Sequence, residues 1–465
     1  MEPLSGMDAV FLYVETPAQP QHVTLTAVLD PASAPGGVSF EQVRDHIGRR
    51  VHRVPPLTRR LVMAPLGLHH PHWVPDPDID LDHHVRRVAL AAPGDERQLA
   101  AMVAQISAVP LDRSHPLWEM WVIEGLADGR FALVAKLHHS TLDGVAGVEQ
   151  MIAFFDLEPV VETGPPPAGA TPEPEPSGLE LTTYAVVARA RSMLRTVPLA
   201  ARTIGSVRAV RAARAEPGVD AGGTPLVTPR TPLNDALTSS RRVAFARLPL
   251  DAIKTVKGAV QGATVNDVIL AVCAGALRRY LDDHDQLPDE PLVAACPVDV
   301  RTEDQRGRSD NRVSAMFTRL PTNVADPLDR LEAAHRAARA AKDEHARFDP
   351  DVLQQWLEVL DPNLFPWLVD WYSRSGTAGR HRPPVNLVVS NVTGPPFPLY
   401  LAGAELVRAF PLGQLLEGIG LNITVMSYRD GIDVGFLAAG DLVGDLDELA
   451  AAVPEAFAEL LAAST

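Results

Sequence analysis

Cysteine, net positive charge and long apolar runs are all scarce in this sequence. Its two cysteines, Cys273 and Cys296, lie in apolar stretches, which leaves no disulfide framework and no CxxC metal spacing. The longest apolar run, Val268 to Leu277, is far shorter than the ~20 residues that a membrane span needs. A formal net charge of −16 argues against a nucleic-acid partner, because nothing global attracts phosphates.

Several signatures are also missing. The opening MEPLSGMDAV is acidic where a signal peptide is basic, so we expect no export and a cytoplasmic protein. No GxSxG elbow occurs, which makes Ser140 and Thr141 poor nucleophiles. No Walker motif occurs, and Gly418 and Gly420 lack the third glycine of a dinucleotide loop. We therefore expect no resident cofactor.

Metal binding is the next class that the pattern disfavours. His69, His70 and His72 resemble ligands superficially, but HEXXH is absent and Pro71 breaks the local geometry. The pair His83-His84 follows apolar positions at strand spacing, so we expect one ring to point outward and the other to pack. We predict no metal site.

The composition of the sequence is typical of a globular protein, and its pattern predicts alternating strands and helices. Hydrophobic residues make up 46% and charged residues 22%, and 465 residues favour two or three domains. We divide the chain into an N-terminal α/β subdomain over 1–158, a Pro-rich linker over 159–180, a basic crossover helical segment over 181–232 and a C-terminal α/β subdomain over 233–465. Two α/β halves joined by a long crossover are the expected architecture.

Periodicity places the main elements. Apolar and β-branched residues predict strands in HVTLTAVLD, WVIEGL, RFALVAKL, PLVAACPVDV, RVSAMFTRL, VNLVVSNV and LNITVMSY. Helical spacing marks SFEQVRDHIGRRV and TVNDVILAVCAGALRRYL, the latter with Thr264 as N-cap. The last segment, DLDELAAAVPEAFAELLAA, is predicted as a surface helix interrupted or kinked at Pro454.

The crossover segment has a distinctive charge. From Leu181 to Ala215 there are seven arginines and no acidic residue, with apolar residues at roughly helical spacing. Such a stretch can rest on anionic lipid headgroups or on a phosphate-bearing ligand. The alternative is a crossover helix whose arginines are solvated or paired with the acidic body. The sequence leaves both interpretations open.

One stretch, KLHHSTLDGVAG from Lys136 to Gly147, combines a strand end with a helix start. Strand side chains alternate, so His138 and His139 cannot both face the same way; one anchors in structure and the other faces a cavity. Asp143 can accept hydrogen bonds or bind an arginine, and Gly144 permits close backbone approach. A lone histidine base suffices for direct acyl transfer to a hydroxyl.

The HHxxxDG pattern from His138 to Gly144 resembles the signature of the CoA-dependent acyltransferase superfamily, to which chloramphenicol acetyltransferase and condensation domains belong. Further segments resemble the bacterial wax ester synthase/diacylglycerol acyltransferase family. They are PLSGMDAVFLYVET, the PLW element in PLWEMWVIEGL, the Asn-Asp element of TVNDVILAVCAGALRRYL, NRVSAMFTRLPT, NLVVSNVTGP and GLNITVMSYRDGIDVGF. The resemblance spans nearly the whole chain.

This resemblance implies two chloramphenicol-acetyltransferase-like subdomains with mixed sheets around a central tunnel. It implies that His139 is the general base, that His138 holds the loop, and that Asp143 is a structural partner of an arginine, for which Arg301 is our candidate. Substrate-binding or oxyanion candidates are Asn266, Asp267, Ser390, Asn391 and Thr424.

The implied reaction is acyl-CoA-dependent O-acyl transfer to diacylglycerol, giving triacylglycerol, and also to fatty alcohols, giving wax esters. The co-substrate is acyl-CoA, and 181–215 is the candidate contact with the inner membrane or lipid bodies. Two alternatives stay open: another hydroxyl acceptor, or a catalytically idle lipid-body protein. Thr393 stands where the family commonly has proline, and Ser140-Thr141-Leu142 are smaller and more polar than usual.

Overall fold

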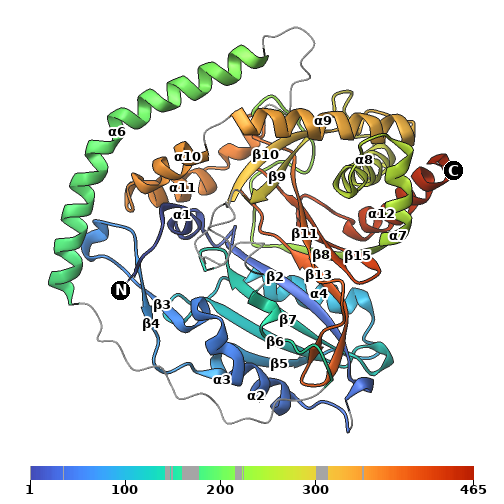
Figure 1. Cartoon of the computed structure of the whole chain (residues 1–465), viewed down its shortest axis with the longest axis horizontal. Coiled ribbons are helices and arrows are strands. Elements are labelled where there is room, and N and C mark those ends of the chain that lie inside the picture. Colours follow the sequence, from blue (N-terminus) through green and yellow to red (C-terminus); the bar gives the residue numbers. More distant parts are fainter. Residues whose placement is uncertain are drawn as a thin grey trace.

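Two six-stranded mixed sheets form the frame of the protein (Figure 1). The structure is a computed structural model that describes residues 2–34, 36–141, 147, 150–159, 177–214, 223, 225–299, 313–347 and 350–464. One sheet has the order β12-β13-β2-β7-β6-β5 and the other β10-β9-β11-β14-β15-β8, and a small third sheet has the order β1-β4-β3.

The first half of the chain supplies most of the first sheet. Its strands are β1 (Glu2–Pro3), β2 (His22–Asp30), β3 (Arg59–Val62), β4 (His72–Pro75), β5 (Val85–Ala89), β6 (Trp118–Glu124) and β7 (Phe131–His138). Its helices are α1 (Gly6–Val14), α2 (Phe40–Arg50), α3 (Leu81–His84) and α4 (Glu96–Ala108). Every residue of β7 is buried, because β7 lies between β2 and β6 inside the sheet.

The second half builds the other sheet and its helical cover. The strands are β8 (Arg241–Pro249), β9 (Leu292–Asp299), β10 (Val313–Leu320), β11 (Leu387–Thr393), β12 (Tyr400–Leu401), β13 (Ala404–Leu412), β14 (Leu421–Tyr428) and β15 (Gly431–Ala439). The helices are α7 (Leu250–Val256), α8 (Val265–Asp283), α9 (Pro327–Arg347), α10 (Pro350–Glu358), α11 (Leu364–Arg374) and α12 (Leu446–Ser464). Helices α7, α8, α9 and α12 pack beside this sheet (Figure 1).

Helix α8 shows how the sequence determines this packing. The Thr264 hydroxyl caps it by accepting a hydrogen bond from the backbone N–H of Asp267, and the Asp267 carboxylate accepts one from the Thr264 backbone N–H. A Cβ at Gly275 would lie 2.3 Å from Arg330 Nη1 and 3.0 Å from Ala456 Cβ. The helix therefore needs glycine where α9 and α12 approach it.

Two strands of the second half cross into the first sheet. β13 pairs antiparallel with β2, and β12 pairs with β13, so residues 400–412 belong to the sheet built mainly from the first half. A linear division at residue 233 therefore does not coincide with the division between the sheets. The pairing ties the halves together, since each sheet depends on residues from 404 to 439.

Three local expectations differ from the structure. Helix α6 (Gly178–Arg214) begins inside the predicted linker, because Ser177 and Glu180 form reciprocal capping hydrogen bonds. His83 and His84 lie at the end of helix α3 rather than in a strand, since Asp80 caps two backbone N–H groups there. Helix α12 lies at the surface as predicted, with one side buried and the other exposed, but it continues through Pro454 without interruption.

Candidate active site

The end of β7 places two adjacent histidines in different surroundings. His138 is the last residue of β7, and its register partner is His22, the first residue of the neighbouring strand β2. The backbone N–H of His139 donates to the Gln21 carbonyl at 2.8 Å, which extends the pairing by one residue. The Thr141 N–H then turns back to the His138 carbonyl at 2.9 Å. The motif is therefore held at the edge of a sheet.

His139 faces an apolar cavity between the two sheets. The cavity has a volume of about 340 Å³, and its lining comes from α1, β2, β7, β9, β10, β11, β13 and β14. His139 is 8% exposed, and its ring stacks on Phe11 with centroids 4.0 Å apart and 21° between the planes. Phe11 thus covers one face of the imidazole and fixes its orientation. The remaining wall residues are largely aliphatic, which keeps bulk water away from the ring.

His138 lies in a buried polar network outside the cavity lining. Its side chain is fully buried, with Nε2 3.2 Å from Glu15 Oε2 and Nδ1 2.7 Å from Ser140 Oγ. Arg113 donates from Nη2 to Glu15 Oε1 at 2.8 Å. Glu15 also accepts the Gln21 N–H at 3.0 Å, and the Gln21 carbonyl holds His139. Glu15 is therefore connected to the positions of both histidines.

The charge state of Glu15 follows from competing effects. Burial favours the neutral acid and raises its pKa, but the hydrogen bond and charge of His138, the charge of Arg113 and the Gln21 N–H together lower that pKa to about 2. The carboxylate is therefore ionised at neutral pH. A negative charge fixed beneath the histidine pair orders this corner without entering the cavity.

The opposite wall carries neutral polar groups. Ser390 of β11 and Thr424 of β14 are register partners in parallel strands, and both line the cavity. Thr424 Oγ1 donates to Asn422 Oδ1 at 2.7 Å, and Asn422 Nδ2 donates to the Gln414 carbonyl at 3.0 Å. Ser390 makes no side-chain hydrogen bond with any residue that the structure describes. Its hydroxyl is thus the more available donor on this wall.

Two family models match the chain almost end to end. The wax ester synthase/diacylglycerol acyltransferase catalytic domain matches residues 4–269, and the C-terminal domain of the same family matches residues 309–461. The chain belongs to this family. The wax ester synthase/diacylglycerol acyltransferase resemblance predicted from the sequence is confirmed, as is its fold of two mixed α/β subdomains.

Relatives of the family agree over the full length. A Mycobacterium tuberculosis protein provisionally named diacylglycerol O-acyltransferase is 38% identical, with 100% of this chain and 91% of its own length covered. The structure of the Marinobacter aquaeolei wax ester synthase/diacylglycerol acyltransferase is 30% identical, with a TM-score of 0.71 and 100% of both chains covered. The Fusarium sporotrichioides trichothecene 15-O-acetyltransferase shares the fold at 12% identity and TM-score 0.61, covering 99% of this chain and 94% of its own.

A condensation domain shares the fold as well. The starter condensation domain of rhizomide synthetase, in complex with C8-CoA and Leu-SNAC, is 13% identical with a TM-score of 0.56, and the match covers 100% of this chain and 94% of that domain. Wax ester synthases/diacylglycerol acyltransferases such as this chain therefore share a scaffold with proteins that bind acyl-CoA.

The structure brings together only part of the predicted site. His139, Ser390 and Thr424 line one cavity, and His138 lies behind it. Asp267 instead caps α8 and accepts a hydrogen bond from His335 Nδ1 at 2.9 Å, which is a structural arrangement. Asn391 donates to Asn266 at 3.4 Å, and neither is among the residues that line the cavity. Asp143, Gly144 and Arg301 lie outside the described residues.

Several cavity residues were not singled out from the sequence. Asn422 is two positions before Thr424 on β14, so the strand alternation that places Thr424 also places Asn422 on the same face. Phe11 lies in the opening segment that resembles the family, but nothing local shows that helix α1 turns this ring onto His139. That contact depends on how α1 docks across the sheet.

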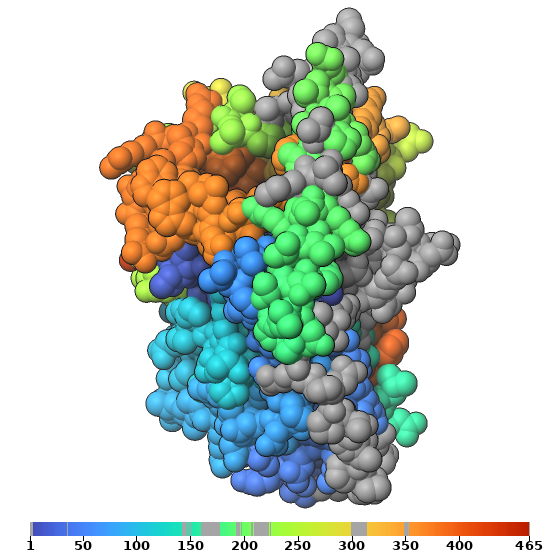
Figure 2. Space-filling view, turned by 90° about the vertical axis from the view of Figure 1, so that its left-hand side faces the viewer, coloured from blue at the N-terminus to red at the C-terminus, as the bar shows by residue number. Residues whose placement is uncertain are grey.

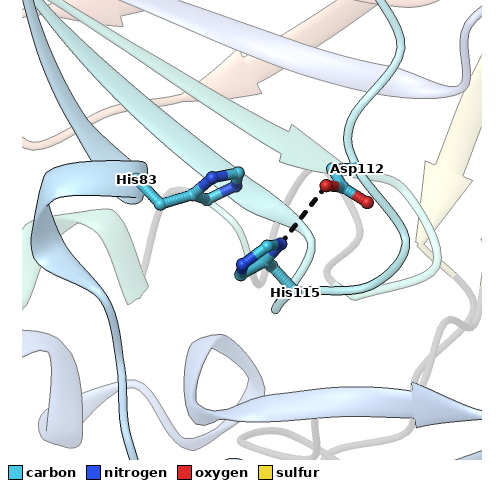
Figure 3. A group of neighbouring side chains, drawn as sticks. All are labelled: His83, Asp112 and His115. Carbon is cyan, nitrogen blue, oxygen red and sulfur yellow. Dashed lines mark ion pairs between the residues drawn. The ribbon is translucent and has the colours of Figure 1, made fainter.

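The other histidine clusters are packing features in this structure. His83, Asp112 and His115 bring their ligand atoms within 4.8 Å of one another (Figure 3). The two imidazoles stack, with centroids 3.8 Å apart and 14° between the planes, and His115 Nδ1 lies 3.3 Å from Asp112 Oδ2. Nitrogen lone pairs lie in the ring planes, so stacked rings do not aim them at one point. A shared metal would require one ring to rotate.

The remaining histidine cluster, His69, His70 and His72, also makes packing contacts. His70 Nδ1 lies 2.8 Å from the Tyr13 hydroxyl, and the His69 and His72 rings meet Tyr184 edge-on at centroid distances of 5.4 and 5.3 Å. These contacts anchor the β3–β4 hairpin to α1 and α6.

Proposed function

We propose that this chain is an acyl-CoA-dependent O-acyltransferase that transfers a long-chain acyl group to diacylglycerol, and to fatty alcohols as a second acceptor class. The observation that carries the proposal is a single histidine, His139, set in an apolar cavity between two sheets. The names of the Mycobacterium and Marinobacter relatives support the acceptor classes. An aliphatic lining favours acyl chains over polar acceptors.

The chemistry follows from one base and no covalent intermediate. The His139 imidazole removes the proton of the acceptor hydroxyl as the oxygen attacks the thioester carbonyl carbon. A tetrahedral oxyanion forms, collapses to the ester and expels the CoA thiolate, which takes the proton back from His139. Phe11 stacking holds the ring at the required angle.

The oxyanion is stabilised by the cavity wall opposite His139, which β11 and β14 form. Ser390 is our preferred donor, because the Thr424 hydroxyl already donates to Asn422. A preorganised donor at this position stabilises the charge that develops on the carbonyl oxygen. Asn266 and Asn391 are less suitable, since both lie outside the cavity lining.

We also propose that Asp143 orients the motif through an arginine, with Arg301 as the candidate, and that Gly144 permits the close turn. His138 has the scaffolding role, since Glu15 and Ser140 engage both of its ring nitrogens.

A lipid surface is the proposed location of the reaction. None of the described helices is long and apolar enough to cross a bilayer. The basic segment 181–215 can instead contact anionic headgroups peripherally, at the inner membrane or at lipid bodies. Two of its arginines are engaged with the protein: Arg189 pairs with Asp361, and Arg202 donates to Gln355 at 3.0 Å. Arg191 and Arg208 are exposed.

Release of CoA from palmitoyl-CoA tests the proposal, measured with dioleoylglycerol, hexadecanol or no acceptor. We expect acceptor-dependent CoA release and ester products, both lost in His139→Ala. His83→Ala, a histidine outside the cavity, is the matched control and should behave as the wild type. Full activity of His139→Ala would exclude the histidine mechanism. Absence of acceptor-dependent release with every alcohol would favour a lipid-binding protein.

A further inference from the structure

Helix α11 exposes a row of large apolar side chains. Leu364, Trp367, Leu368 and Trp371 are 55, 62, 42 and 55% exposed. Their spacing of i, i+3, i+4 and i+7 places all four along one side of the helix. We call these four residues the α11 apolar face. Soluble surfaces rarely expose two neighbouring tryptophans, and such patches mark interaction sites.

The opposite side of α11 holds the helix in place. Phe365 packs against the apolar cluster that contains Leu4 and Leu12. The Tyr372 hydroxyl lies 2.7 Å from His381 Nε2, and Ser373 donates to Glu417 at 2.9 Å. The helix is therefore attached without help from the α11 apolar face, and folding of the described chain does not account for that face.

Arginines lie on α11 itself, on the turn that follows α11 and contacts it, and on α6, which contacts α10. Helix α6 runs along the same side of the molecule as the α10–α11 pair (Figure 2), and Trp356 of α10 donates to Thr203 of α6 at 2.8 Å. Exposed arginines of α6, of α11 and of the segment that follows α11 are Arg191, Arg208, Arg374, Arg380 and Arg382. The acidic residues nearest in sequence are paired: Asp361 with Arg189, and Asp370 with Arg374 at 2.9 Å.

Helix α6 exposes smaller apolar side chains than α11 does. Among its described side chains, Leu181, Ala185 and Leu199 are buried, while Leu179, Val186 and Val187 near its start are exposed. The two tryptophans of α11 are therefore the largest apolar side chains exposed on the described parts of these helices, and α6 adds charge beside them. Tryptophan suits the headgroup boundary, because its ring is apolar while its N–H remains hydrated.

The position of α11 relates this surface to the cavity. Helix α1 packs against both α10 and α11, and it carries Met7 and Phe11, which line the cavity around His139. One helix thus separates the α11 apolar face from the base. A lipid acceptor drawn from a surface held against α11 has a short route to the site.

We propose that the α11 apolar face seats on an anionic phospholipid surface and so positions the cavity for a lipid acceptor. This inference rests on the proposed acylation of lipid acceptors. A second copy of the chain is a poorer occupant: a stable interface buries about 800 Å² on each partner, more than four side chains provide, and the arginines of α6 and α11 would repel their own copies.

Vesicle flotation of the full chain tests the proposal, with phosphatidylcholine alone or mixed with phosphatidylglycerol. We expect flotation with the mixed vesicles, weakening with salt, and about tenfold less binding by Trp367→Ala/Trp371→Ala. Phe397→Ala removes another exposed aromatic ring, in the β11–β12 connection, and should bind as the wild type. Wild-type protein that stays unbound, or a double variant that floats equally, overturns the proposal.

Activity and mass measurements complete the test. The double variant should lose about tenfold more kcat/KM on vesicle-embedded diacylglycerol than on a short alcohol in solution. If the wild type acylates neither acceptor, the proposed function fails; if it acylates both and the variant loses equally on both, only the docking proposal fails. Light scattering that shows a wild-type dimer dissociating in the variant assigns the face to a second copy. Leu364→Ser/Leu368→Ser replaces the tryptophan variant if the latter does not fold.

Discussion

The two walls of the cavity differ in how they use polar groups. The wall formed by β2 and β7 presents His139, and behind it lies a charged layer that includes Glu15 and Lys136, with the buried ring of His22 beside them. Burial lowers the pKa of Lys136 even though Glu119 lies 3.5 Å away, and burial lowers the pKa of His22 as well. The polar side chains that β11 and β14 present to the cavity are the hydroxyls of Ser390 and Thr424 and the amide of Asn422, beside the aliphatic Val388 and Val392.

This difference fits the demands of acyl transfer. A base must keep one orientation through proton removal and return, which a rigid charged layer beneath it secures. An oxyanion needs donors, and a carboxylate on that wall would repel it. The walls therefore have separate tasks, and each task can be tested by a substitution on one side.

Removing the base should have the largest effect. His139→Ala is expected to lower kcat for CoA release by a factor of about 10² to 10⁴, the usual contribution of a general base. Stability should change little, since the lost ring lies at a cavity. Thermal unfolding alongside kinetics distinguishes the two effects. A kcat within threefold of wild type would assign proton removal to another group.

The next largest effect is expected from removing the buried Glu15 carboxylate, and it should appear in the free energy of unfolding. Glu15→Ala leaves His138 and Arg113 without their shared carboxylate, so we expect a loss of roughly 3 kcal/mol in unfolding free energy. Arg87→Ala removes an exposed pair with Glu124 and should cost at most about 1 kcal/mol. Urea denaturation measures both. Equal losses would mean that the buried network adds nothing.

The same carboxylate gives a pH dependence with a defined sign. The pKa of Glu15 is about 2 in the folded protein against an ordinary value of 4.5, so the unfolded chain binds the proton first on acidification. The contribution of Glu15 is complete above about pH 4.5 and is lost as pH falls toward 2. Glutamine does not titrate, so the free energy of unfolding of Glu15→Gln should lack this decrease between pH 4.5 and 2. Urea denaturation at several pH values measures the difference.

The Glu15 network also shows where prediction from sequence stops. Strand alternation indicated that His138 and His139 have different surroundings. The Thr264 cap located the start of α8, and the apolar periods located seven of the fifteen described strands. The partner of His138 lies 123 positions earlier in the chain, in the residue that follows α1. No local pattern encodes that pairing, because it depends on how α1 docks over the sheet. The resemblance identified the family but not this contact.

The cavity was predictable only in outline for a similar reason. Its lining comes from seven strands that lie far apart along the chain, and β13 joins the sheet of the other half. Side-chain alternation gives the face of each strand but not the neighbour opposite. Asn266 and Asp267 illustrate the consequence: a distinctive sequence element marked a helix start rather than the cavity.

Removing the donor from the second wall should have a smaller effect than removing the base. Ser390→Ala is expected to lower kcat about a hundredfold with little change in KM, the pattern for an interaction made in the transition state. Thr424→Val should cost less than tenfold, because that hydroxyl is already engaged with Asn422. The reverse ranking would assign the oxyanion to Thr424.

Reducing the cavity volume should change acyl-chain preference rather than chemistry. Ala295 lines the cavity from β9, the strand beside β11, and Ala295→Leu adds about three methylene-sized groups to a space of about 340 Å³. We expect about a tenfold lower kcat/KM for the longest acyl-CoA, with short chains unaffected. Kinetics across acyl-CoA lengths measure this. A uniform loss at every length would indicate distortion of the sheet instead.

The smallest effect is expected from the histidine cluster that belongs to neither wall. His83 and His115 stack beside Asp112, and none of the three lines the cavity. Burial and the neighbouring His115 lower the pKa of His83, and the two stacked rings would share a metal only if one of them rotated. Treatment with a chelator and the His83→Ala/His115→Ala variant should each leave kcat within twofold of wild type.

The proposed reaction assigns proton transfer to His139 alone. A loss of kcat on chelation in the wild type but not in the variant would therefore place a functional metal in this cluster. The same loss in both proteins would place it elsewhere.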